Sequence, residues 1–181
     1  MKVIKEPFLS IIVPVFNEEK RINNLTKIVG YLKKKKYNWE LIIVDDGSTD
    51  KTKKILLYLK KRIKFQLFTY SQNIGKGFAV KTGMLSSKGK YRLFLDIDLS
   101  TPITEFEKFH PYLKKYGIII GSRKMKTSNL IVRQSFVREI LGKMFTLLSK
   151  EVLEVNISDF TCGFKCFSKK AAKEIFSRQK I

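Results

Sequence analysis

Short runs of apolar residues alternate along much of the chain with segments in which apolar side chains recur at helical spacing. The apolar runs predict strands at 8–15, 39–44, 65–70, 91–96 and 118–120. The helical spacing predicts helices at about 18–36, 50–62, 78–86 and 103–115. Because strand and helix alternate with short connections, we expect an α/β fold with a mainly parallel sheet flanked by helices on both faces.

Capping residues mark two of the expected helix starts. Asn17 precedes two glutamates, whose negative charge suits the positive end of a helix dipole. Thr101 is followed by Pro102, a pair that predicts an N-cap with proline at the first helical position. We therefore expect one helix to begin directly after Asn17 and another directly after Thr101.

The alternation lapses after Arg123. We interpret the polar stretch 124–131 as a lid over a site. Residues 133–152 predict a helix with a broad apolar face and interleaved basic residues, which fits either a core helix or a helix lying on a membrane surface. A loop with a short strand at 156–167 and a helix at about 169–176 complete the pattern.

Polar or acidic residues stand at the ends of three of the predicted strands: Asn17 with Glu18 after the first, Asp45 with Asp46 after the second, and Asp96 with Asp98 at the end of the fourth. The carboxyl ends of parallel strands meet at one edge of a sheet, where ligands bind. A lone Asp-x-Asp is often an ordinary turn, but three acidic strand ends favour a site. Asp96 and Asp98 supply the hard oxygen ligands that Mg²⁺ or Mn²⁺ prefers.

The charge of the chain indicates anionic partners. Lys and Arg number 37 against 16 Asp and Glu, a net charge of +21. Nucleic acid, an anionic membrane surface and phosphorylated ligands are all candidates, although much of this charge is expected to be a solvated coat. No run of about 18 apolar residues predicts a membrane-spanning helix. We interpret Cys162 and Cys166 as reduced packing residues.

Six short blocks, in this order, resemble the family 2 inverting glycosyltransferases of the GT-A fold, which use nucleotide-sugar donors. The blocks are SIIVPVFNE at 10–18, IVDDGSTD at 43–50, NIGKG at 73–77, DID at 96–98, GSR at 121–123 and DFTCGFK at 159–165. The last two, with DLSTP at 98–102, are similar to the polyprenyl-phosphate branch, most of all to dolichyl-phosphate β-glucosyltransferases. The resemblance implies a Rossmann-like nucleotide-diphospho-sugar transferase fold. It also implies transfer of a hexose, glucose more than mannose, to polyprenyl or dolichyl phosphate with inversion.

The resemblance further implies roles for individual residues. It assigns nucleotide-sugar binding to Pro14, Phe16, Glu18, Asp45, Asp46, Lys76 and Asp96; Mg²⁺ or Mn²⁺ binding to Asp96 and Asp98; catalysis to Asp159, Arg123 and Lys165; and acceptor-phosphate binding to Arg123, Arg133 and Arg138. The expected donor is UDP-glucose ahead of GDP-mannose. Asp159 is the candidate general base for a hydroxyl acceptor. A phosphate acceptor is already largely ionised at neutral pH and instead needs cationic positioning.

Other functions stay open at this point. One is a glycosyltransferase with a saccharide hydroxyl acceptor, as in cell-surface polysaccharide synthesis. Another is a non-catalytic basic domain that binds anions or nucleic acid, but acidic strand ends would repel nucleic-acid phosphates, so we expect no nucleic-acid partner. A truncated, inactive domain is a further possibility.

We expect one glycosyltransferase catalytic domain over 1–181. Within it, about 8–123 would form the nucleotide-sugar-binding core and about 124–181 an acceptor-side segment that faces a membrane. Chains of this kind continue further, so we interpret this one as a minimal or C-terminally truncated form. The expected location is cytoplasmic, peripherally associated with the cytosolic face of a membrane.

Overall fold

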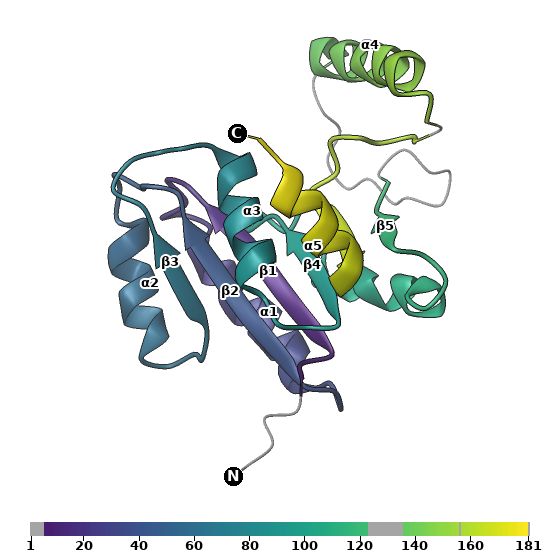
Figure 1. The fold of residues 1–181 in the computed structure, drawn as a ribbon. Helices are drawn as coiled ribbons and strands as arrows, with labels where there is room; N and C mark the ends of the chain where they lie inside the picture. The colour runs from purple at the N-terminus through teal and green to yellow at the C-terminus, as the bar shows by residue number, and fades with distance from the viewer. Residues whose placement is uncertain (1–5, 123–135, 156, 181) are drawn as a thin grey trace. The chain divides into compact units, whose positions relative to one another are not determined.

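A six-stranded sheet carries the fold of this protein (Figure 1). The computed structural model describes residues 6–122, 136–155 and 157–180. Its strands are β1 Leu9–Val15, β2 Trp39–Asp45, β3 Gln66–Thr69, β4 Tyr91–Leu95, β5 Ile118–Ile120 and β6 Phe164–Ser168, in the spatial order β3-β2-β1-β4-β6-β5. The pairs β1–β2, β1–β4 and β2–β3 are parallel, and β4–β6 is antiparallel. The expectation of a mainly parallel sheet is therefore confirmed.

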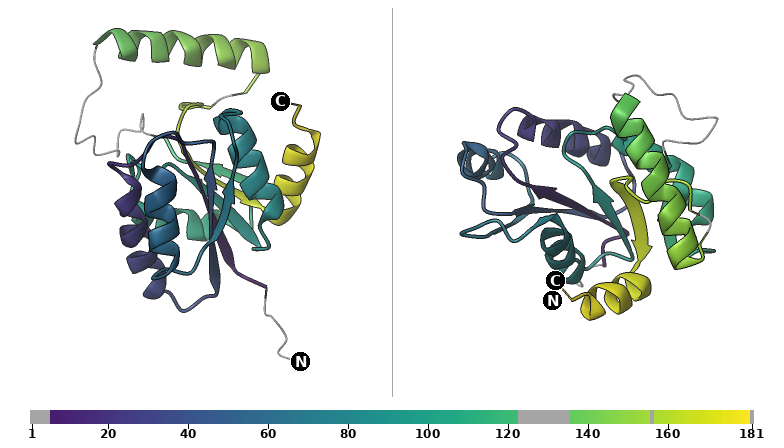
Figure 2. Two further views of the ribbon diagram at one scale, coloured as in Figure 1. Left: turned by 90° about the vertical axis from the view of Figure 1, so that its left-hand side faces the viewer. Right: turned by 90° about the horizontal axis from the view of Figure 1, so that it is seen from above.

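Burial explains why the central strands are mainly apolar, with Ser10 in β1 and Arg92 in β4 as buried polar exceptions. All seven residues of β1 and all five of β4 are buried, as expected for strands covered on both faces. Figure 2 shows α1 (Leu25–Lys33) and α2 (Thr52–Lys60) on one face of the sheet. It shows α3 (Lys76–Ser86) and α5 (Lys169–Arg178) on the other. Helices on both faces are thus also confirmed.

The helix starts differ from those expected at both capping signals. Asn17 does not cap a helix: it has a positive φ of 53°, and a 3-10 helix η1 (Ile22–Asn24) precedes α1. Thr101 is not the cap either, because Pro102 itself has extended backbone before the 3-10 helix η2 (Ile103–Tyr112). Both predictions were wrong: the side chain of Asn17 instead accepts hydrogen bonds from Thr49 and Asp50, and the helix after Thr101 begins one residue later than expected, at Ile103.

The chain divides into two compact units. The first comprises residues 1–119 and 164–181, and the second residues 120–163. The strand β6 and the helix α5 therefore belong to the unit of the central strands, although the sequence grouped them with the acceptor-side segment. The second unit contains α4 (Phe136–Leu153), whose described residues include exposed Leu147, Leu148 and Val152. None of the helices in the described ranges is long and apolar enough to cross a membrane.

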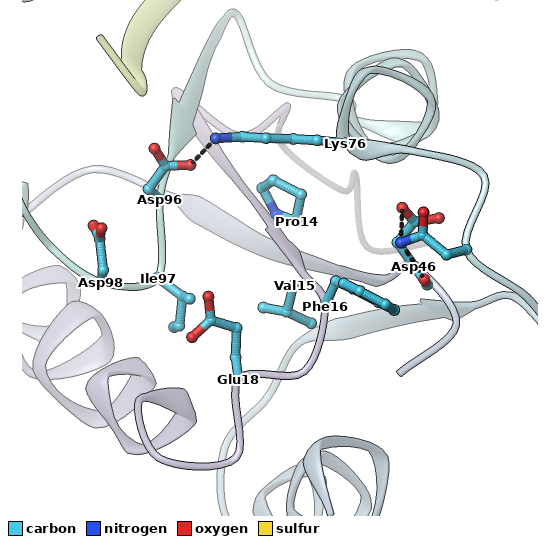
Figure 3. A pocket seen from close by; sticks show the side chains of 10 residues that line it. Pro14, Val15, Phe16, Glu18, Asp46, Lys76, Asp96, Ile97 and Asp98 are labelled. Atoms are coloured by element: carbon cyan, nitrogen blue, oxygen red, sulfur yellow. Dashed lines mark hydrogen bonds and ion pairs between the residues drawn. The ribbon is translucent and has the colours of Figure 1, made fainter. Parts of the chain in front are cut away.

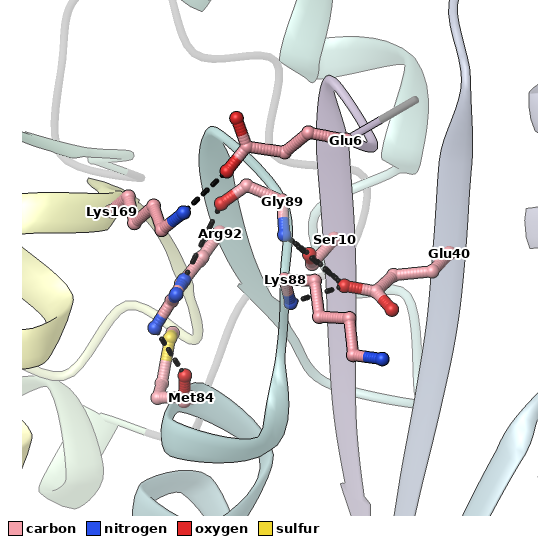
Figure 4. Close-up of polar contacts among 8 residues, drawn as sticks. All are labelled: Glu6, Ser10, Glu40, Met84, Lys88, Gly89, Arg92 and Lys169. Carbon is pink, nitrogen blue, oxygen red and sulfur yellow. Dashed lines mark hydrogen bonds and ion pairs between the residues drawn. The ribbon is translucent and has the colours of Figure 1, made fainter. Parts of the chain in front are cut away.

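A partly buried polar network joins the amino-terminal ends of β1, β2 and β4 (Figure 4). The Ser10 hydroxyl donates to Glu40 Oε1 at 2.6 Å, and the same oxygen accepts the Lys88 N–H at 2.6 Å. Gly89 N–H donates to Ser10 Oγ at 2.8 Å. Arg92, 5% exposed, donates to the Met84 carbonyl at 2.6 Å, and its burial lowers the pKa of its guanidinium. This network fixes the start of each central strand.

Replacing Glu40 with Ala should lower the free energy of unfolding by about 2–3 kcal/mol. The substitution removes the acceptor for the buried Ser10 hydroxyl and for the Lys88 amide. Urea denaturation followed by circular dichroism measures the change. Gln66→Ala is the matched control, because Gln66 donates to the other Glu40 oxygen from an exposed position. Equal decreases in the free energy of unfolding in the two variants would contradict the importance of the hydrogen bond between Ser10 and Glu40.

Candidate active site

The carboxyl ends of β1, β2 and β4 surround a pocket of about 320 Å³. Its lining residues are Pro14, Val15, Phe16, Glu18, Asp46, Asn73, Lys76, Asp96, Ile97 and Asp98. All ten lie in the first compact unit. Figure 3 shows Asp46, Asp96 and Asp98 around this one space, with Glu18 reaching in from the loop after β1. The acidic strand ends that the sequence marked thus share one cavity, with the exception of Asp45.

The loop after β1 is held by the loop after β2. Asn17 Oδ1 accepts the N–H groups of Thr49 at 2.8 Å and Asp50 at 3.3 Å. In return, Ser48 Oγ accepts the Asn17 N–H at 3.0 Å, and Thr52 Oγ1 accepts the Glu18 N–H at 2.7 Å. These bonds place Phe16, whose ring is 43% exposed, and Glu18 at the pocket. An exposed aromatic ring beside a polar cavity is a surface on which a nucleobase can stack.

Asp46 holds the glycine loop that precedes α3. Its carboxylate is 2% exposed and accepts the N–H of Ile74 at 2.9 Å, the N–H of Gly75 at 2.9 Å and the amide of Asn73 at 3.0 Å. Both oxygens are therefore engaged by the protein itself. Asp45, 1% exposed, accepts the Ser48 N–H at 3.1 Å and is not among the lining residues.

Gly47 permits the close approach of these two loops. Its φ is +73°, and a Cβ on it would lie 2.3 Å from the carbonyl carbon of Gln72. Any side chain would therefore push the glycine loop away from β2. The Asp-Gly-Ser sequence after β2 and the Asn-x-Gly-Lys-Gly sequence before α3 form one packed unit.

The loop after β4 places two carboxylates beside the cavity, and α3 brings one ammonium group to them. Asp96 Oδ1 lies 2.8 Å from Lys76 Nζ. Asp98 Oδ1 accepts the Ser100 N–H at 2.9 Å, and the amide of Asn24 donates to the Ile97 carbonyl at 3.0 Å. The β4 loop is thus tied to η1, and both aspartates remain at the pocket.

The donor set fits a divalent cation that is completed by substrate. Within the described ranges, no cluster of three or more His, Cys, Asp or Glu residues could hold a metal. Mg²⁺ is commonly bound by one or two carboxylates together with substrate phosphates and waters. Asp96 and Asp98 supply two such carboxylates, and the ammonium group of Lys76 already stands as a cation at one of them.

The residues assigned to the acceptor side are either not described or not among the lining residues of this pocket. Arg123 and Arg133 fall outside the described residues, as does the expected lid at 124–131, and Arg138 lies in α4, where its side chain is not described. Asp159 is 1% exposed and accepts the Thr161 hydroxyl at 3.1 Å; Lys165 is half-buried in β6. Their assigned roles stay predictions.

Sequence reasoning missed Asn73, which lines the pocket and donates to Asp46. It opens the Asn-x-Gly-Lys-Gly block, so its place before a glycine turn was the available signal. Both cysteines are buried, and burial raises the pKa of the Cys166 thiol to about 12. A thiol held protonated in this way is neither a ready metal ligand nor a nucleophile.

Comparisons with known proteins agree on one family. The family model described as "Glycosyl transferase family 2" matches residues 10–176. The chain is 37% identical over 184 residues to a dolichyl-phosphate beta-glucosyltransferase of Dictyostelium discoideum, covering 93% of this chain and 56% of that protein. It is 34% identical to the Homo sapiens protein of the same name, covering 93% and 57%. The chain therefore spans little more than half the length of these curated relatives.

Solved structures support the fold. Glucosyl-3-phosphoglycerate synthase from Mycobacterium tuberculosis in complex with UDP aligns with a TM-score of 0.61 at 21% identity, over 91% of this chain and 57% of that one. A mannosyltransferase from Pyrobaculum calidifontis in complex with GDP-Man and Mn²⁺ aligns with a TM-score of 0.61 at 17% identity, over 95% and 47%. At these identities the likeness concerns the fold alone.

Proposed function

This chain belongs to glycosyl transferase family 2, and from that premise we propose that it transfers glucose from UDP-glucose to dolichyl phosphate with inversion. One observation supports a donor site most directly: the ends of β1, β2 and β4 bring Glu18, Asp46, Asp96 and Asp98 around a single cavity. The names of the relatives at 34–37% identity favour glucose and a dolichyl-phosphate acceptor over mannose.

In this proposal the pocket divides into a base end and a diphosphate end. Pro14 and the exposed ring of Phe16 form an apolar surface for the uracil, and Glu18 accepts hydrogen bonds from the nucleoside. Asp46 keeps the glycine loop in place so that Lys76 faces the diphosphate. Asp45 acts through the loop after β2, since it does not line the cavity.

The diphosphate end supplies the charge that the departing UDP needs. A divalent cation held by Asp96 and Asp98 would act as a Lewis acid on the diphosphate oxygens. Lys76 pairs with a phosphate oxygen and stabilises the negative charge that develops there. The acceptor phosphate is largely ionised at neutral pH and is already nucleophilic, so Arg123, Arg133, Arg138 and Lys165 serve to position it. The buried Asp159 orients this acceptor side and is the base only for a hydroxyl acceptor.

The proposed location follows from the acceptor. Dolichyl phosphate is a membrane lipid, and a chain with a net charge of +21 is attracted to anionic lipid surfaces. We therefore place the protein peripherally at the cytosolic face of a membrane. The exposed apolar side chains of α4 are suited to such contact.

Donor binding and product chemistry test this function. Isothermal titration in Mn²⁺ should show UDP-glucose binding with at least about tenfold higher affinity than GDP-mannose, a difference of about 1.4 kcal/mol. Incubation with labelled UDP-glucose and dolichyl phosphate vesicles should give a product that extracts into organic solvent and is labile to mild acid. Label that appears only in water-soluble saccharide would instead indicate a hydroxyl acceptor. An absence of nucleotide binding would contradict the assignment of the donor site.

A further inference from the structure

The ion pair between Lys76 and Asp96 connects the glycine loop to the end of β4. Lys76 Nζ lies 2.8 Å from Asp96 Oδ1 (Figure 3). It also lies 5.2 Å from the centre of the Phe94 ring. The side chain of Lys76 is 61% exposed, and that of Asp96 is 30% exposed. A pair this exposed contributes at most about 1 kcal/mol to stability. It therefore opens at little cost.

The position of Lys76 gives it no role in its own helix. Lys76 is the first residue of α3, and the first turn of that helix contains no acidic residue. The amino-terminal end of a helix carries partial positive charge, so a lysine there is disfavoured by the helix dipole. Asp96, the first residue after β4, supplies the compensating negative charge. The ammonium group thus occupies the carboxylate to which the site chemistry assigns a divalent cation.

We propose that Lys76 is an exchangeable counter-ion of Asp96, which competes with the divalent cation until a nucleotide diphosphate draws the ammonium group away. This inference rests on the proposed donor site and specifies the order in which its charges assemble. Without nucleotide, a divalent cation and the ammonium group of Lys76 would both pair with the carboxylate of Asp96, and these two positive charges would repel each other. A diphosphate adds negative charge at the same place, accepts the lysine and leaves Asp96 to the metal. Metal and nucleotide consequently bind with positive coupling.

Mn²⁺ binding, measured without turnover, separates this role from a structural one. Lys76→Met keeps an unbranched side chain, one atom shorter, and removes its charge. In an electron paramagnetic resonance titration of free Mn²⁺, this variant should bind Mn²⁺ alone at least about fivefold more tightly than the wild type. The same variant should bind UDP more weakly, because it lacks the phosphate partner. A lysine that only held the loop in place would, when removed, weaken both ligands.

Two further variants complete the design. Lys53→Met removes one exposed positive charge from α2 at a residue that does not line the pocket, and should leave Mn²⁺ affinity as in the wild type. Lys76→Arg keeps the charge and should keep the weak binding of Mn²⁺ alone. Unchanged or weaker Mn²⁺ affinity in Lys76→Met would overturn the inference.

The same titrations distinguish failure of this inference from failure of the proposed function. A wild-type chain that binds Mn²⁺ but not UDP would contradict the donor site, while the comparison of Mn²⁺ alone would still decide whether Lys76 competes for Asp96. Tight binding of both ligands with no effect of Lys76→Met would overturn only the inference. A wild-type chain that binds neither would overturn both.

Discussion

Replacing Asp98 with Ala should lower glucosyl transfer by about 100-fold or more at saturating UDP-glucose and Mn²⁺. The physical reason is that electrostatic stabilisation of a departing charged group is commonly worth about 3–4 kcal/mol in the transition state. Asp98 is one of only two carboxylates that end β4 at the pocket, so its removal leaves Asp96 as the one protein ligand from that loop. The rate of formation of organic-extractable labelled lipid measures the effect.

The fold should tolerate this substitution. Asp98 is exposed, and the bond that it accepts from the Ser100 N–H closes a local turn. We expect the free energy of unfolding to change by less than about 1 kcal/mol. Glu105→Ala is the control for loss of an acidic side chain nearby in sequence, because Glu105 pairs with Lys108 on η2 and does not line the pocket. Normal transfer by Asp98→Ala would refute its assignment as a metal ligand.

Replacing Asp46 with Ala should abolish measurable nucleotide binding and lower the free energy of unfolding by about 3 kcal/mol. The buried carboxylate accepts the N–H groups of Ile74 and Gly75 and the amide of Asn73. Hydrogen bonds to a charged acceptor contribute more than neutral ones, and buried donors left without an acceptor add a further cost. The loss should be measured by urea denaturation and by UDP titration of the same samples.

Two further variants test whether Asp46 acts through the glycine loop. Asp46→Asn keeps the shape but presents an amide to N–H donors, so it should also destabilise the protein. Asn73→Ala removes a single bond and should cost about 1 kcal/mol. Full stability of Asp46→Ala combined with lost UDP binding would mean that Asp46 acts on the nucleotide directly, as the family resemblance implies, and not through the loop.

The central strands could be predicted from the sequence because a buried strand appears as a short run of consecutive apolar residues. Every residue of β1 is buried, so all but Ser10, whose hydroxyl is hydrogen-bonded, are apolar, and the run ends where the cavity begins. The acidic ends of β2 and β4 could likewise be placed at one edge of the sheet. That inference needed only strand direction, and the parallel pairing of β1 with both strands confirms it.

Contacts between residues distant in sequence explain what the sequence did not predict. Asn17 is a residue type that commonly caps helices. Its side chain instead accepts a hydrogen bond from the N–H of Thr49, 32 residues away. Asp46 was expected to bind a ligand. Its carboxylate instead accepts hydrogen bonds from the glycine loop, including the N–H of Ile74, 28 residues further on. The antiparallel pairing of β6 with β4 is equally non-local, and no spacing within β6 indicates its neighbour or direction.

The path of the chain between β5 and β6 has a consequence for how such proteins diversify. The chain leaves the sheet after β5 and returns at β6, its neighbour in the sheet, with 120–163 as a separate compact unit. An insertion bounded by adjacent strands can be lengthened, replaced or grafted without reordering the strands whose ends place Pro14, Asp46 and Asp96 at the pocket. Because we assign part of acceptor recognition to this insertion, new acceptors can evolve, or be engineered, on an unchanged donor scaffold.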